Sequence, residues 1–188
     1  MISLPLLKRN MSQTWKILLI LLAAMTLYTT VIIYMYDPEL AHMLNDYQIA
    51  LPGIMSAVGM TGIAGNLTEF VYIYLYGFIM LVFPIIAIII LGNKLLAHYI
   101  DSGSMGVLLA TPNSRLKILL TQLLSMLAGI TLLIVLITAI GVGTCEGLFP
   151  GELDIPLFLK LNAALLLFHL MLGGCLLYTS DAADEEDS

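Results

Sequence analysis

Few side chains in this sequence could do chemistry, and they are scattered along the chain. The three histidines, His42, His98 and His169, fall in three separate segments, and no two of them have the spacing of a metal site. The sequence has no phosphate-binding loop of the Gly-Lys-Ser/Thr type and no serine in a nucleophile-elbow motif. We therefore expect no enzymatic activity, no cofactor and no metal site in this chain.

Two ionisable residues, Glu69 and His169, are candidates for a polar transport path. Glu69 is at the start of one long apolar run, and His169 is near the middle of another. Ionisable groups in such runs are costly and often functional. Each also has a simpler role that stays open. His169 could form a hydrogen bond between helices, and Glu69 could complement the dipole at a helix N-terminus.

The main polar interruption between apolar runs is Leu95–Leu119, LLAHYIDSGSMGVLLATPNSRLKIL. Gly103 permits a sharp turn, and the pair Thr111-Pro112 is typical of the start of a new helix. Arg115 and a lysine two residues later would then lie at a helix N-terminus, where positive charge opposes the helix dipole. Helix stability therefore does not explain these charges, whereas lipid phosphates or an acidic partner surface would.

The elements that must position these residues are membrane-spanning helices. The chain is 60% hydrophobic and 11% charged, whereas soluble domains are about half apolar and about a quarter charged. Four apolar runs are each long enough to cross a hydrocarbon core of about 30 Å. We expect an all-α, polytopic transmembrane helix bundle with spans near residues 17–36, 67–91, 118–142 and 157–178.

The connectors between these runs differ in character. Residues 1–16 form a basic N-terminal segment. After the first span, Leu40–Leu51 is a candidate for a short amphipathic helix, which Pro52-Gly53 would end. Pro84 is expected to kink the second span, and residues 143–156 are expected to connect the third span to the fourth.

Basic residues predict the orientation of the spans. The N-terminal segment has three Lys or Arg residues and the stretch 93–117 has three more, whereas segments 37–66 and 143–156 have none. The positive-inside rule therefore predicts a cytoplasmic N-terminus and a cytoplasmic loop between the second and third spans. Three tyrosines at positions 72, 74 and 76 would form an aromatic belt at the outer interface. The sequence has no basic tract of the kind that binds nucleic acid, and we expect no nucleic-acid partner.

The last ten residues, 179–188, change abruptly to the acidic run TSDAADEEDS. One interpretation is a short disordered tail. The other is a translated sequencing adapter joined to the reading frame, in which case the natural protein continues beyond about residue 176.

The polar stretch resembles part of a known family. The pattern Asp101-x-Gly103-Ser104, followed by Leu108-Leu109-Ala110-Thr111-Pro112-Asn113-Ser114-Arg115, is similar to the first cytoplasmic loop of ABC transporter permeases of the type 2 exporter class. The place of the loop between the second and third spans also looks like this class. The resemblance covers roughly residues 10–176. Members of the class usually have six spans, so the four found here would be a part of the full set, and the acidic position is often a glutamate or a run of acids.

This resemblance implies a permease subunit in the bacterial plasma (inner) membrane. The subunit would pair with a second permease half, and its loop at residues 93–117 would contact an ATP-binding-cassette ATPase subunit, which would hydrolyse the ATP. The loop residues that the resemblance implicates are Asp101, Gly103, Ser104, Leu108, Leu109, Pro112, Ser114 and Arg115. Two alternatives stay open: an accessory or assembly protein of the membrane, and a fragment of an ion-coupled carrier that uses Glu69, Lys160 or His169.

Overall fold

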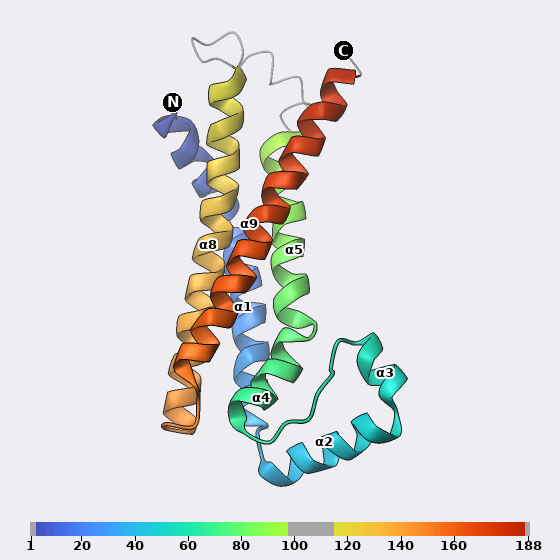
Figure 1. Ribbon diagram of the computed structural model, residues 1–188. Coiled ribbons are helices and arrows are strands. Elements are labelled where there is room, and N and C mark those ends of the chain that lie inside the picture. The colour runs from blue at the N-terminus through green and yellow to red at the C-terminus, as the bar shows by residue number, and fades with distance from the viewer. Residues whose placement is uncertain (1–2, 98–114, 187–188) are drawn as a thin grey trace. The chain divides into compact units, whose positions relative to one another are not determined.

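The computed structural model describes residues 3–97 and 115–186, with side chains for 3–95 and 117–176, and all regular structure in these ranges is helical (Figure 1). Four segments are long and apolar enough to cross a membrane: Leu4–Tyr34, Leu67–Leu95, Lys117–Leu148 and Ile155–Leu176. The prediction of an all-α, multi-pass membrane protein is confirmed. The elements in chain order are α1 Leu4–Tyr34, α2 Pro38–Ala50, α3 Pro52–Ala57, α4 Leu67–Val71, η1 Tyr72–Tyr76, α5 Ile79–Gly92, η2 Asn93–Ala97, α8 Arg115–Leu148 and α9 Ile155–Glu186.

Three of the helices extend well beyond the apolar runs that predicted them. The first helix begins at Leu4, so most of the basic N-terminal segment is helical; Pro5 is in its first turn, where proline is tolerated. Helix α8 continues to Leu148 and shortens the predicted connector, because the glycines in its last turns do not end it. Helix α9 includes Thr179–Glu186, which differs from the interpretation of this segment as a disordered tail.

The second span is not a regular α-helix throughout. Two segments with π-helical hydrogen bonding, η1 and η2, lie on either side of α5. Pro84 lies inside α5, as its place in the second apolar run predicted. Segments of π-helix are rare and frequently occur at functional sites.

The chain packs as two compact units, and the division between them falls within the long helices. Unit 1 comprises residues 1–20, 84–133 and 166–188, and unit 2 comprises residues 21–83 and 134–165. Each unit therefore contains parts of all four spans and has its own core.

Unit 1 is packed through small residues on its helices. A methyl group added to Gly129 would lie 3.2 Å from the Leu18 side chain, and one added to Gly173 would lie 3.0 Å from Met126. Small residues let helices approach closely in membranes, where van der Waals packing replaces the hydrophobic effect between helices. Outward-facing apolar side chains such as Ile20, which is 67% exposed, suit contact with lipid tails.

Unit 2 contains an arm, defined here as residues 38–66, that packs beside α4 (Figure 1). Ala41 and Ala64 of the arm join a buried cluster with Phe70, Ile73 and Tyr74. Tyr36, which precedes the arm, packs edge-on against the rings of Phe70 and Phe149, each with its centroid 5.4 Å away. The candidate helix at Leu40–Leu51 corresponds to α2, Pro38–Ala50, which ends before Pro52.

Specific contacts close the arm on itself and attach it to the second span. The Asn45 amide donates to the carbonyl oxygen of Ala64 and accepts from its N–H, both at 2.9 Å. The backbone at Gly59 touches the backbone at Gly77, since a methyl group on Gly59 would lie 2.2 Å from the Gly77 oxygen. Gly59 also has a φ of 74°, which favours glycine. The bonds of Asn45 join two parts of the arm, and the contact at Gly77 fixes the arm against the start of the second span.

Adding one methyl group at this contact should loosen the arm. In Gly77→Ala the new Cβ would lie 2.5 Å from the Gly59 oxygen, so we expect a loss of about 1–3 kcal/mol in the free energy of unfolding. Thermal unfolding of the purified protein in detergent measures the change. Gly147→Ala is the matched control, because a methyl group there meets nothing within 4 Å. Equal melting temperatures for the two variants would contradict the proposed contact.

Candidate functional site

Most of the residues predicted to contact an ATPase lie outside the described residues. These are Asp101, Gly103, Ser104, Leu108, Leu109, Pro112 and Ser114. Arg115 is the first residue of α8, and its side chain is also outside the description. The structure does describe the two helix ends that flank the loop, η2 up to Ala97 and α8 from Arg115, and both belong to unit 1.

Both flanking ends are tied to the first turns of α1. The Lys94 ammonium group donates to the carbonyl oxygen of Gln13 at 2.7 Å. On the other side of the loop, the N–H of Ser3 donates to the Thr121 hydroxyl at 3.1 Å, and the Asn10 amide donates to the Ser125 hydroxyl at 3.1 Å. Three hydrogen bonds therefore connect the start of the chain to the helices that enter and leave the loop.

A buried group of polar side chains surrounds these ties. We name it the inner polar cluster and define it as Asn10, Thr14, Thr121, Gln122 and Ser125, all of which are buried. The hydroxyls of Thr14, Thr121 and Ser125 each donate to the carbonyl oxygen four residues earlier, at 2.7–2.9 Å. These local bonds satisfy the hydroxyl donors within each helix and leave the oxygen atoms free to accept from a neighbouring helix.

The two amide side chains of the inner polar cluster are incompletely bonded. Within the described part of the chain, Gln122 has no hydrogen-bond partner at either amide atom, and the Asn10 oxygen has none. Both residues have no exposed surface. An unbonded polar group costs about 1–3 kcal/mol when it is buried, so an unpartnered Gln122 would lower the stability of unit 1. The cluster is therefore a candidate for a functional role.

Replacing Gln122 should show this cost directly. We expect Gln122→Leu, which keeps the volume and removes the unbonded amide, to raise the free energy of unfolding by about 1–2 kcal/mol. Ser125→Ala should have the opposite effect, because it removes the acceptor of the Asn10 amide. Chemical unfolding of the two variants in micelles tests both signs. A Gln122→Leu protein less stable than Ser125→Ala would contradict this description of the cluster.

Glu69 takes part in a local hydrogen-bonded cap at the start of α4. Its N–H donates to the Asn66 side-chain oxygen at 2.9 Å, and its carboxylate accepts from the N–H of Gly65 at 2.8 Å. This reciprocal arrangement is close to a capping box. The side chain is exposed and belongs to unit 2. Glu69 therefore makes the contacts expected of a residue at a helix N-terminus. Its role in a transport path stays a prediction.

His169 is fully buried in α9 and belongs to unit 1. Its ring meets the ring of Phe168 edge to face, with the centroids 5.2 Å apart. Glu69 and His169 therefore lie in different units. Among the described residues no three His, Cys, Asp or Glu side chains are grouped to hold a metal ion, and Cys145 and Cys175 do not form a disulfide.

Unit 2 has its own polar ties between spans. The Thr68 hydroxyl accepts from the N–H of Asp154 at 2.9 Å, which joins the start of the second span to the turn before α9. Nearby, the Asn162 amide donates to the Tyr76 hydroxyl. Sequence reasoning missed these residues and the inner polar cluster. The available signal was the recurrence of polar side chains inside apolar runs, as at positions 121, 122 and 125.

No protein-family model, curated protein or solved structure matches this chain. Its function has to be argued from its own residues and their contacts.

Proposed function

We propose that this chain is a permease subunit of an ATP-binding-cassette transporter of the type 2 exporter class. Its loop between the second and third spans would receive the movement of a separate ATPase subunit. The observation that carries the proposal is the set of ties at the ends of this loop. Lys94 on one side and Thr121 and Ser125 on the other are all hydrogen-bonded to the first turns of α1.

These ties suit a coupling element for a mechanical reason. A push on a loop between two separate helices would be absorbed by bending at the helix ends. When both ends are bonded to a third helix and packed in one unit, the same push moves the unit as a body. Unit 1 contains parts of all four spans, so movement of the loop would reach each of them.

Charge supports a cytoplasmic partner at this end of the protein. The three basic residues before residue 17 and the three between 93 and 117 fall at the same end of their spans, and the positive-inside rule places that end in the cytoplasm. The membrane would then be the bacterial plasma membrane, with the N-terminus inside. Arg115, at the first position of α8, opposes the helix dipole, and an acidic ATPase surface would compensate for it. A second permease half would complete the transporter.

Charge reversal at Arg115 tests the docking contact. We expect Arg115→Glu to reduce co-purification of the ATPase subunit about tenfold or more, because a like charge at an interface costs well over 1 kcal/mol. Lys8→Glu is the control, since Lys8 is an exposed basic residue near the N-terminal end of α1, in the other basic segment of the chain. The proposal fails if the ATPase still binds after Leu108, Leu109 and Arg115 are all replaced.

The tie at Lys94 tests transmission separately from docking. In Lys94→Met the alkyl chain is kept and the bond to Gln13 is lost. We expect the ATPase subunit to bind as before, but the influence of the permease on its ATP hydrolysis rate to fall about three- to tenfold, the equivalent of one hydrogen bond. The exposed Lys16→Met is the control. An unchanged hydrolysis rate in the Lys94 variant would argue against this path.

A further inference from the structure

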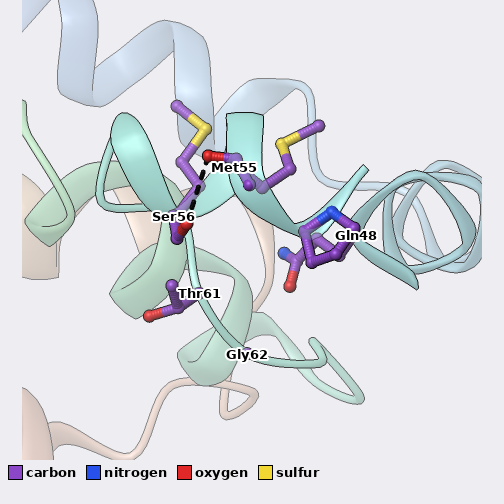
Figure 2. Close-up of a pocket in the computed structure, with 8 residues that line it drawn as sticks. Gln48, Met55, Ser56, Thr61 and Gly62 are labelled. Atoms are coloured by element: carbon purple, nitrogen blue, oxygen red, sulfur yellow. Dashed lines mark hydrogen bonds between the residues drawn. The ribbon is translucent and has the colours of Figure 1, made fainter. Parts of the chain in front are cut away.

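The arm of unit 2 lines an open pocket of about 450 Å³ (Figure 2). Figure 2 shows Gln48 on one side and Ser56 and Thr61 on the other, with Met55 and Gly62 between them. The volume is within the range of about 300–1,000 Å³ that small-molecule sites have. The lining residues are Gln48, Pro52, Gly53, Met55, Ser56, Met60, Thr61 and Gly62.

Contacts with the second span hold the walls of this pocket in place. The Gln48 amide donates to the Tyr74 hydroxyl at 3.3 Å, and Met60 packs against the buried cluster around Phe70. On the third side, Gly62 approaches Ile73 so closely that an added methyl group would lie 3.3 Å from it. The pocket is therefore preformed by the same contacts that attach the arm.

The contact between Gly59 and Gly77 places the arm beside the first turns of the second span. The tyrosines at positions 72, 74 and 76 are of the type that gathers at a membrane interface. Gly77 directly follows these tyrosines, and Gly59 lies against it. The arm is therefore at the depth expected of the interface between head groups and acyl chains.

The exposed side chains of the arm agree with this depth. Leu51, Ile54, Val58 and Ile63 are large and apolar, and Ile54 and Ile63 are 62% and 66% exposed. A run of such side chains within thirteen residues is unfavourable in water but suits the boundary between head groups and acyl chains. The pocket thus lies at the level where lipids place their uppermost acyl carbons and their ester groups.

The residues that line the pocket do not favour a charged ligand. None of the eight lining residues is ionisable. The thioethers of Met55 and Met60 provide adaptable apolar walls, and Gln48, Ser56 and Thr61 provide uncharged hydrogen-bonding groups. Ser56 already donates to the Gly53 oxygen at 3.2 Å, whereas the amide oxygen of Gln48 has no donor among the described residues.

We propose that this pocket binds an uncharged lipid. The acyl chain would lie against Met55 and Met60, and a hydroxyl or ester group would bond to Gln48 and Thr61. The site depends on unit 2 alone, so it holds whether or not the transport function proposed above is correct.

Photo-crosslinking of the full chain tests the site. The protein is placed in phosphatidylcholine nanodiscs that contain one diazirine-tagged probe: diacylglycerol, phosphatidylcholine or the anionic phosphatidylglycerol. We expect the diacylglycerol probe to label the segment 48–62 about tenfold more than the phosphatidylglycerol probe does, as judged by peptide mapping. Equal labelling by the three probes would mean ordinary contact with bulk lipid and would overturn the proposal.

Two variants make the result specific. Gly53→Phe places a ring at a pocket position where an added Cβ meets nothing within 4 Å, and we expect it to abolish the excess labelling by diacylglycerol; Gly147→Phe, at an equally open position outside the pocket, should not. Thr61→Val keeps the shape and removes a hydroxyl, so labelling by diacylglycerol should fall roughly three- to tenfold. Unchanged labelling of the Gly53→Phe variant would overturn the proposal. If that variant does not fold, unchanged labelling of the Thr61→Val variant would overturn it.

Discussion

The constraint on which this structure depends is the cost of an unbonded polar group in a membrane. A spanning segment must satisfy its backbone internally, which is why the described residues in the spans are helical. Side chains follow the same rule. Along α8, hydroxyls at five positions donate to the carbonyl oxygen four residues earlier: Thr121, Ser125, Thr131, Thr138 and Thr144. Against this background Gln122 differs, because its amide has no hydrogen-bond partner in the part of the chain that the structure describes.

The two units meet this constraint in different ways. In unit 1, hydrogen bonds connect the helix ends on both sides of the loop to the start of the chain. In unit 2, the amide of Asn45 joins two parts of the arm, and the close backbone contact at Gly77 holds the arm against a helix. The first arrangement would suit the transmission of movement, and the second forms the walls of a pocket. The proposals that rest on the two arrangements can be tested separately.

Sequence alone predicted the class of the fold and the number of spans, because long apolar runs have few alternatives. The helices α1 and α8 extend beyond the predicted spans, since neither basic residues nor isolated glycines stop a helix when the backbone remains bonded. The contacts of the candidate site could not be predicted from the sequence. Spacing along α8 shows that residues 121 and 125 share a face, but not that Ser3 and Asn10, over a hundred residues away, lie opposite them.

The π-helical segment Tyr72–Tyr76 has a consequence for register. A π-helical turn holds one residue more than an α-helical turn, so the segment acts as an insertion within the span. Deleting one residue there would restore regular hydrogen bonding and rotate everything before it by about 100° relative to α5. Phe70, which packs against Tyr36, would then point away from its present neighbours. The irregular turn thus determines which face of α4 is directed toward the arm.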